Sequence, residues 1–311
     1  MPNITSDNIK LLREKTGAGM MDCKNALLEN DGDISKATSW LRKKGIAKAE
    51  KKSSRVAAQG LVGLKKCKDF ALLVEVNSET DFVSKNTDFQ NFVETILNVG
   101  ADKKLSLEDL LKSNFLGNET VAEALQNLIA KIGENIVIRR ISYLESGEDN
   151  SIFGSYIHNK INDNIGRMAC VVKLSSKNND KEVTDFANKI AMHITAFRPL
   201  SLDEGSLDKN FIEKEKEIYS SQLKSSGKPE NIIEKIVTGK IKKYLSDVTL
   251  LNQSWVLDPS LTVTQVLNEF NNSNKTDLSI TDFKLLILGE GIEIEEKSFS
   301  EEVASQVNNT T

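Results

Sequence analysis

The stretch Phe70-Ala-Leu-Leu-Val-Glu-Val-Asn-Ser-Glu-Thr-Asp-Phe-Val83 joins two kinds of apolar pattern. Its first half is a continuous apolar run of strand length. A second such run, Leu61 to Leu64, precedes it across a short polar turn, so the two predict a β-hairpin. Its second half leads into a segment with helical spacing, whose apolar side is formed by Phe82, Phe89, Phe92, Val93, Ile96 and Leu97. A hairpin followed by an amphipathic helix predicts an α+β unit.

The turn Thr80-Asp81-Phe82-Val83 has a simple local interpretation as the capped start of that helix. The Thr80 hydroxyl and the Asp81 carboxylate would cover free N–H groups of the first turn. Phe82 would then pack into the core as a hydrophobic staple.

The same order of elements recurs later in the chain. The second copy consists of Gly154 to Ile157, a turn rich in Asn and Asp, Met168 to Leu174, and a helix with Phe186, Ile190 and Ile194. It follows the segment Gly60 to Leu97 at an offset of 94 residues at the first glycine and about 97–98 residues later. We therefore expect a core of two related α+β subdomains with antiparallel sheets.

Residues 4–44 predict three short helices with a small common core. The run Thr16-Gly-Ala-Gly-Met-Met-Asp-Cys-Lys-Asn-Ala-Leu27 is a glycine-rich turn that opens into the second helix near Asp22. The third helix begins after Asp33, which suits an N-cap, and is expected to end at Gly45. Met20 and Met21 have two interpretations: they pack in the core, or they use their flexible, polarizable side chains to dock on a partner.

The remaining segments are less specific. Residues 42–55 carry seven Lys and Arg residues, which suit a solvated helical linker or a basic stripe that faces a partner. Residues 208–250 predict a projecting antiparallel helical hairpin that turns at Ser225-Ser-Gly-Lys228. A helix near Val263 to Phe270, a strand near Phe283 to Leu288 and an acidic tail with one short helix around Phe299 to Ala304 complete the chain.

Composition excludes several classes of protein. The chain has 311 residues, of which 39% are hydrophobic and 28% charged, as in globular proteins. Its net charge is −4, although residues 1–60 carry +5, and this overall acidity argues against nucleic-acid binding. No apolar run reaches the roughly 18 residues of a membrane span, and no signal peptide precedes the first helix. Three scattered cysteines suit a reducing compartment, so we expect a cytoplasmic protein.

No motif for enzyme chemistry is recognised. Gly227-Lys228 and Gly239-Lys240 lack the upstream glycine and the following hydroxyl of a phosphate-binding loop, and there is no His-Glu-x-x-His or paired cysteine motif. His193 lies in an apolar helix, where a hydrogen-bonded core histidine is expected, whereas His158 ends a strand and is the more exposed candidate for a partner contact. We expect no chemical active site, no bound cofactor and no metal of its own.

Several of these motifs closely resemble the elongation factor Ts family, and the resemblance covers essentially the whole chain. The matching segments are the Thr16 to Leu27 run, Gly32-Asp-Ile34 with Trp40-Leu-Arg42 and Gly45, Val56-Ala-Ala-Gln-Gly60, Asn77-Ser-Glu-Thr-Asp-Phe-Val83, Lys131-Ile-Gly-Glu-Asn135 with Arg139-Arg140, Ala191-Met-His-Ile194, Ser226-Gly-Lys-Pro229, and Leu250 to Pro259 before Thr262-Val263. Departures are Gln59 in place of the usual acidic residue, a longer turn at residues 159–165, and Thr195-Ala-Phe-Arg-Pro199, where small residues are usual.

The resemblance implies a domain organisation. It predicts a three-helix module similar to ubiquitin-associated domains with a basic linker over residues 1–55, and a first core subdomain over 56–148. A second core subdomain, including the hairpin 208–250, would cover 149–288, and an acidic module 289–311.

The resemblance also implies a function: guanine nucleotide exchange on elongation factor Tu. In that role Thr80, Asp81, Phe82 and Val83 dislocate the Mg²⁺ of the partner, and Met20, Met21 and Lys24 anchor the chain on it. His158 is a further candidate contact, and the hairpin could pair two complexes into a dimer of heterodimers.

Two other interpretations remain open. A binding adaptor without exchange activity explains residues 4–44 but leaves the Thr80 turn and the large core without a role. An enzyme with an unrecognised site needs converging titratable groups, which the sequence does not show.

Overall fold

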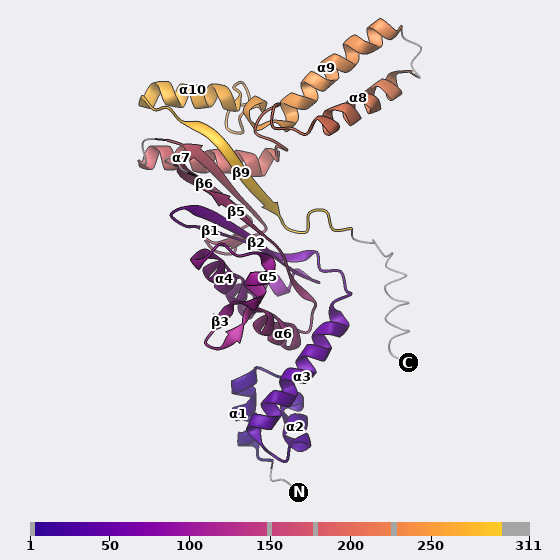
Figure 1. Cartoon of the computed structure of the whole chain (residues 1–311), viewed down its shortest axis with the longest axis vertical. Helices are drawn as coiled ribbons and strands as arrows, with labels where there is room; N and C mark the ends of the chain where they lie inside the picture. The colour runs from indigo at the N-terminus through magenta and orange to yellow at the C-terminus, as the bar shows by residue number, and fades with distance from the viewer. Residues whose placement is uncertain (1–3, 148–150, 177–179, 225–228, 294–311) are drawn as a thin grey trace.

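The computed structural model describes residues 4–147, 151–176, 180–224 and 229–293. The molecule is elongated, with an N-terminal helical module at one end, two sheets in the middle and a projecting helical hairpin at the other end (Figure 1). This arrangement confirms the predicted α+β class with antiparallel sheets. The Ser225 to Lys228 turn and the short C-terminal helix lie outside the described residues. The domain boundaries and the likeness to ubiquitin-associated domains stay predictions.

The N-terminal module is built from three helices, α1 (Ser6–Thr16), α2 (Met20–Glu29) and α3 (Ile34–Lys52). The Asp33 carboxylate caps α3 by accepting hydrogen bonds from two backbone N–H groups, as predicted. The expected end of this helix at Gly45 is wrong, because α3 continues to Lys52. Gly45 is buried beside Ala130 of α6, so packing against the core carries the helix past a residue of low helix propensity.

The first sheet has the strand order β5-β2-β1-β7, and its neighbouring strands run antiparallel. Helices and a short hairpin cover one of its faces with a shared apolar cluster. The strands are β1 (Gln59–Lys66), β2 (Phe70–Ser78), β5 (Ile136–Glu145) and β7 (Ile165–Gly166), and the covering elements are η1 (Val83–Lys85), α4 (Thr87–Asp102), α5 (Leu107–Lys112), β3 (Asn114–Leu116), β4 (Glu119–Thr120) and α6 (Val121–Ile132).

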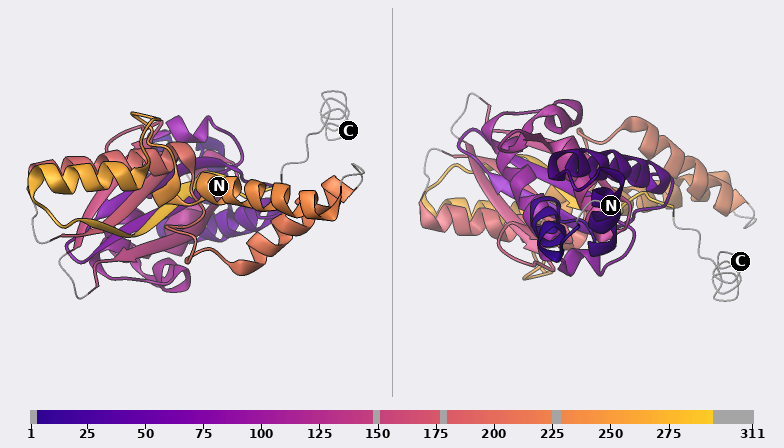
Figure 2. Two further views of the ribbon diagram at one scale, coloured as in Figure 1. Left: turned by 90° about the horizontal axis from the view of Figure 1, so that it is seen from above. Right: turned by 90° about the horizontal axis from the view of Figure 1, so that it is seen from below.

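The second sheet has the order β6-β8-β9 and is also antiparallel. Helices α7 and α10 cover its outer face, while α8 and α9 extend sideways as the predicted hairpin (Figure 2). The elements are β6 (Ser151–His158), β8 (Met168–Ser175), α7 (Lys181–Phe197), α8 (Lys209–Lys224), α9 (Glu230–Val248), η2 (Leu250–Asn252), α10 (Val263–Asn274) and β9 (Ser279–Ile287).

The two sheets are related, as the internal repeat predicts. In each, a hairpin is followed by a helix that packs on it, and a later strand pairs with the second hairpin strand. Both of these later pairings are interrupted by a β-bulge, one after Glu75 and the other 98 residues later, after Lys173. A shared irregularity at matching positions is stronger support for a repeat than shared strands alone.

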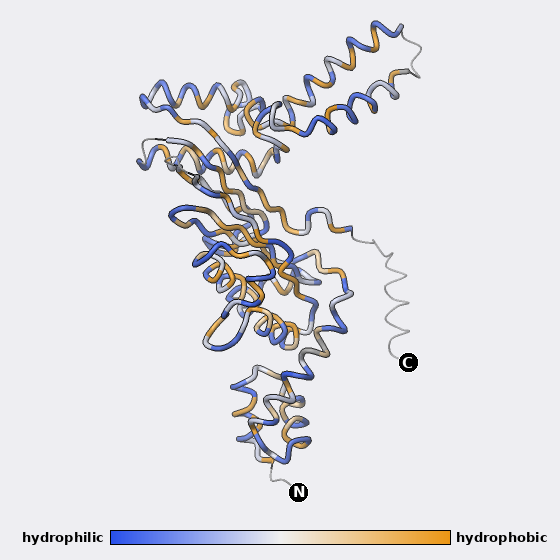
Figure 3. The backbone as a smooth tube through the Cα atoms, in the orientation of Figure 1, coloured by the Kyte–Doolittle hydropathy of each residue, from blue (hydrophilic) through white to orange (hydrophobic). Residues whose placement is uncertain are grey.

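The sheets face each other across an apolar layer. The side chains that form this layer are Val62, Leu64, Ala71, Leu73 and Leu144 of the first sheet and Phe153, Ala169, Val171 and Leu286 of the second. Alternate residues of β2, such as Leu72 and Val74, point the other way, into the helical cluster. Because β2 is buried on both faces, it is apolar from Phe70 to Val74 and again at Val76, and the strands are mostly orange in Figure 3.

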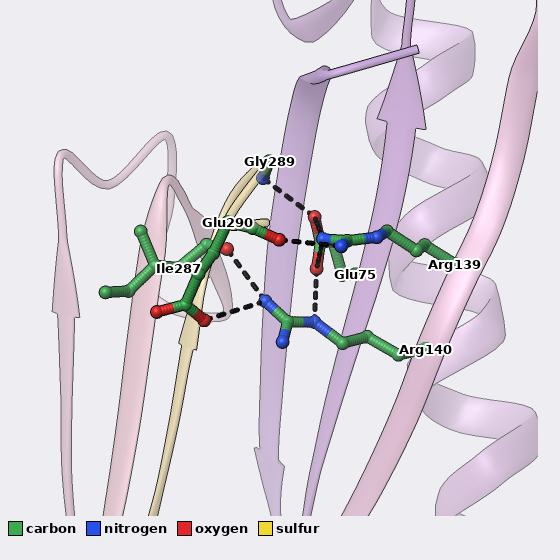
Figure 4. A network of polar contacts seen from close by, with 6 residues as sticks. All are labelled: Glu75, Arg139, Arg140, Ile287, Gly289 and Glu290. Atoms are coloured by element: carbon green, nitrogen blue, oxygen red, sulfur yellow. Dashed lines mark hydrogen bonds and ion pairs between the residues drawn. The ribbon is translucent and has the colours of Figure 1, made fainter. Parts of the chain in front are cut away.

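One carboxylate, Glu75, is fully buried in this inter-sheet layer. It accepts hydrogen bonds from Arg139 Nη1 at 3.1 and 3.3 Å, from Arg140 Nε, and from the Gly289 N–H at 2.8 Å (Figure 4). Arg139 is the extra residue of the bulge in β5, which lets two consecutive arginines reach the same carboxylate. Arg140 also donates to the Ile287 carbonyl at 2.8 Å, so the cluster ties the end of β9 to the first sheet.

His193 is the predicted hydrogen-bonded core histidine. Its Nδ1 accepts from the Val256 N–H at 3.2 Å, so its Nε2 carries the proton and donates to Gln253 Oε1 at 3.0 Å. Its ring stacks between Trp255 and Phe197, and burial lowers its pKa. The imidazole is therefore neutral in the folded chain.

We predict that Glu75→Ala lowers the free energy of unfolding by about 2–4 kcal/mol, because two guanidinium groups lose their carboxylate and the sheets lose a cross-link. The arginines are 28% and 32% exposed, so water compensates part of the loss. Urea denaturation measures the change. The matched control is Glu108→Ala on α5, whose ion pair with Lys112 is exposed and should change stability by less than about 0.5 kcal/mol. Equal stabilities of the two variants would contradict the cross-link.

We also predict that stability falls as the pH drops below the ordinary histidine pKa of 6.5. The lowered pKa of folded His193 means that the unfolded chain takes up this proton first, which favours unfolding. Folding lowers the pKa of Asp33, Asp203 and Asp258 from its ordinary value of 3.8. These carboxylates therefore affect stability only at lower pH. Denaturation between about pH 5 and 7 should show the slope, and His193→Gln should flatten it. If the pH dependence of stability persists in His193→Gln, another group causes it.

Candidate functional site

An exposed aromatic residue stands at the end of β2. Phe82 is 74% exposed, Asp81 is exposed beside it, and Val83 is 4% exposed and packs in the core. The expectation that Phe82 packs into the core as a staple is therefore wrong, because its ring faces solvent and the adjacent Val83 enters the core instead. Helix α4 begins only at Thr87, and the Asn86 side chain caps it. We call residues 79–86 the Phe82 loop.

Hydrogen bonds hold the Phe82 loop in place. The Glu134 carboxylate accepts from the Thr80 N–H at 2.9 Å and from the Thr80 hydroxyl at 2.6 Å. The Ser84 hydroxyl donates to the Asp81 carbonyl at 2.6 Å, and Gln90 Nε2 donates to the Ser84 carbonyl at 2.9 Å. Thr80 is thus a support of the loop rather than a helix cap. An exposed phenyl ring on a loop held this firmly is suited to insertion into a partner.

A second exposed apolar group lies on α2. Met20 and Met21 are 56% and 65% exposed, and Lys24 is exposed one turn later. The opposite side of α2 supplies Cys23, Ala26 and Leu27 to the core of the module, so the core interpretation of the methionines is wrong. Leu28, 49% exposed, extends the group by another turn. We call Met20, Met21, Lys24 and Leu28 the α2 patch.

Sequence reasoning missed Leu28, although a signal was present. It follows Met21 by seven residues and Lys24 by four, which places the three on one helix face. The neighbouring Leu27 is buried, and only the packing of the module decides which of the two adjacent leucines faces outward.

His158 ends β6 and is exposed, as expected. It lies opposite Met168 of β8, and its ring is 6.2 Å from the ring of Tyr156, measured between centroids. Together with Met192 and Arg198 of the α7 end, these side chains line a shallow pocket. The predicted site residues thus belong to three separate elements, namely α2, the Phe82 loop and β6.

Four of the seven cations in the basic segment 42–55 have acceptors on other elements, which neither interpretation of the segment includes. Arg42 pairs with Glu123 of α6, and Lys44 Nζ lies 3.1 Å from Asp22 Oδ1. Lys52 Nζ donates to the Gly133 carbonyl, and Arg55 Nη1 lies 3.4 Å from Glu79 Oε1. These cations fix α3 to the rest of the chain. The side chain of Lys48 lies outside what the structure describes.

The described part of the chain contains no group of three His, Cys, Asp or Glu side chains arranged to hold a metal ion. None of its helices is long and apolar enough to cross a membrane.

Comparison with known proteins gives one consistent result. The family model described as elongation factor TS matches residues 79–290. The chain is similar to elongation factor Ts of Methylorubrum populi, at 45% identity over 98% of this chain and 99% of the relative, and of Bartonella bacilliformis, at 44% identity over 97% and 98%. Elongation factor Ts of Rickettsia felis is 42% identical over 97% of each chain. By these matches, which span nearly its full length, the chain belongs to the elongation factor Ts family of translation elongation factors.

Proposed function

We propose that this protein is a guanine nucleotide exchange factor for elongation factor Tu and acts in the cytoplasm during translation elongation. It binds the GDP-loaded partner, displaces the bound Mg²⁺ and promotes release of GDP so that GTP enters. The observation that carries the proposal is the exposed Phe82 ring on a firmly held loop in a chain of this family.

The proposed mechanism depends on charge around the phosphates of the partner's nucleotide. A P-loop GTPase holds those phosphates with backbone N–H groups, a lysine and Mg²⁺, so loss of Mg²⁺ coordination leaves phosphate charge poorly neutralised. Phe82 acts as a rigid wedge that shifts side chains of the partner near the metal. The exposed Asp81 carboxylate competes for or reorders groups around it. Thr80 and Val83 hold the loop, through Glu134 and through the core respectively.

The α2 patch anchors the chain on the partner. Met20, Met21 and Leu28 supply apolar contact that adapts to the opposing surface, and Lys24 suits a carboxylate or a carbonyl. His158 is a further candidate contact at the far sheet. Pairing of two complexes through the α8–α9 hairpin stays a prediction.

In this proposal the chain has no chemical active site and no cofactor of its own, since GDP and Mg²⁺ belong to the partner. Linkage then sets the energetics: if the factor weakens nucleotide binding, the nucleotide weakens binding of the factor by the same free energy. An effect of about 10⁴-fold requires about 5.5 kcal/mol of differential binding, more than one contact supplies. The Phe82 loop and the α2 patch must therefore act together.

Release of fluorescent GDP from purified elongation factor Tu, with and without this protein, tests the proposal. We expect strong acceleration that diminishes as Mg²⁺ is raised, because excess metal opposes its displacement. Binding without acceleration would favour the adaptor interpretation. Absence of both would contradict the proposal.

We predict that Phe82→Ala reduces the maximal rate of GDP release on the order of 10²-fold, the loss expected when about 2.7 kcal/mol of transition-state stabilisation is removed. The fold should be retained, because the ring is 74% exposed. Stopped-flow fluorescence gives the rate and circular dichroism the fold. Phe211→Ala on α8, which removes a ring that is 53% exposed, is the matched control and should exchange normally. If Phe82→Ala accelerates GDP release as much as the unsubstituted protein does, Phe82 does not act as a wedge.

We predict a different effect for the double variant Met20→Ala, Met21→Ala. Loss of an anchoring contact should raise the factor concentration that gives half-maximal release by roughly tenfold or more, while the rate at saturation changes less, because the anchor supplies a smaller share of the differential binding than the Phe82 ring does. Leu116→Ala, which removes an exposed leucine from β3, serves as the control. A fall in the saturating rate alone would place the methionines in the wedge mechanism.

A further inference from the structure

The turn between α6 and β5, Gly133-Glu134-Asn135, touches both of the regions that the proposed function requires to act together. On one side it contacts the end of α3, the helix that carries the N-terminal module. On the other side it contacts the Phe82 loop. We call these three residues the junction turn.

The contacts with the Phe82 loop form a reciprocal pair. The Glu134 side chain accepts from the Thr80 N–H and hydroxyl at 2.9 and 2.6 Å. In the opposite direction, the Glu79 side chain accepts from the Asn135 N–H at 2.6 Å. A side chain of each segment thus accepts a hydrogen bond from the backbone of the other. This geometry fixes both the position and the direction of the Phe82 loop.

The contacts with the end of α3 and with the residues just after it use the remaining polar groups of the junction turn. The Asn135 amide, in a residue only 3% exposed, donates to the Arg55 carbonyl at 2.7 Å and to the Ser53 carbonyl at 3.5 Å. The Gly133 carbonyl accepts from Lys52 Nζ, and Arg55 Nη1 lies 3.4 Å from the same Glu79 oxygen that Asn135 holds. The end of α3 and the base of the Phe82 loop therefore share one hydrogen-bonded cluster around the buried Asn135.

We infer that Asn135 and Glu134 are positioning residues that hold the α2 patch and the Phe82 loop at one fixed separation and orientation. This inference rests on the proposed function. Two contacts on one rigid body bind as a single unit, because formation of the first places the second at a high effective concentration. If the module could swing, the anchor would form without delivering the Phe82 ring, and part of the binding energy would be lost to ordering.

The sequence alone does not distinguish this role from that of an ordinary turn. Gly133 adopts a left-handed conformation with φ of 89° and ends α6, which accounts for the glycine but not for the two residues after it. Both Glu134 and Asn135 direct their side chains to other segments, at sequence separations of 54 and about 80 residues.

The test compares Asn135→Ala with Asn127→Ala. Asn127 is a matched control because its side-chain amide, on exposed α6 surface, donates only to Glu119 in the described contacts. Spin labels at Lys10→Cys on α1 and Lys103→Cys after α4, with half-buried Cys67 changed to Ser, report the module-to-core distance distribution. GDP release from elongation factor Tu is measured on the same variants without labels.

We expect a narrow distance distribution for the unsubstituted chain and for Asn127→Ala, and a broader one for Asn135→Ala, in which the Arg42–Glu123 pair and the packing of Gly45 against Ala130 still hold part of α3. The concentration of Asn135→Ala for half-maximal GDP release should rise on the order of tenfold, as expected for loss of a fixed link between two contacts. An unbroadened distribution in Asn135→Ala overturns the inference. A broadened distribution with unchanged GDP release overturns it as well, because the fixed separation would then have no effect on the partner.

A second variant covers the case in which Asn135→Ala fails to fold. Glu134→Ala removes a partly exposed side chain and with it both carboxylate oxygens that accept from Thr80. It should reduce the hydrogen-exchange protection of the Thr80 amide on the order of tenfold and reduce GDP release with it. Unchanged protection would overturn the role of Glu134. If the unsubstituted protein itself does not accelerate GDP release, the proposed function fails, and the distance distributions alone decide whether the junction turn holds the module.

Discussion

Burial of the layer between the two sheets is the constraint on which the rest of the structure depends. Each sheet has one face covered by its own helices, so the second face needs a partner, and the other sheet provides it. Within this layer Glu75 adds a further constraint, because a buried carboxylate is tolerated only where its donors are correctly placed. The two arginines of the β5 bulge and the Gly289 N–H meet this requirement in one arrangement.

In the proposed function, this rigid double layer is the support from which the candidate site acts on another protein. Its candidate functional groups are exposed side chains held on rigid supports and spread along an elongated body (Figure 1). The Phe82 loop is attached to the first sheet, the α2 patch to the N-terminal module, and His158 to the second sheet. Such a body can bring widely spaced contacts to a partner at the same time, and the binding energy of one contact then supports the distortion produced by another.

Much of the fold was predictable because its signals are local. The β1–β2 hairpin, the repeat of the strand–strand–helix unit and the helices of the module follow from apolar spacing and from capping residues such as Asp33. The errors share one physical origin. Phe82 and Val83 are adjacent apolar residues, and local pattern could not tell which one enters the core. Gly45 is a helix breaker by propensity, but burial against α6 overrides it. Basic residues in and just after α3, such as Arg42 and Arg55, have acceptors that are distant in sequence.

By itself, the sequence determined the class of the fold, the internal repeat, the hairpin and the stretch that contains the candidate site, because each depends on residues close together in the chain. Only the tertiary structure decided that Phe82, Met20 and Met21 face outward, that Leu28 joins them, and that Glu134 and Asn135 connect the Phe82 loop to α3. The physical reason is that exposure and hydrogen-bond partnership depend on what lies opposite a side chain. Here the opposing groups come from segments about 50 to 80 residues away, whose arrangement is set by the burial of the sheets.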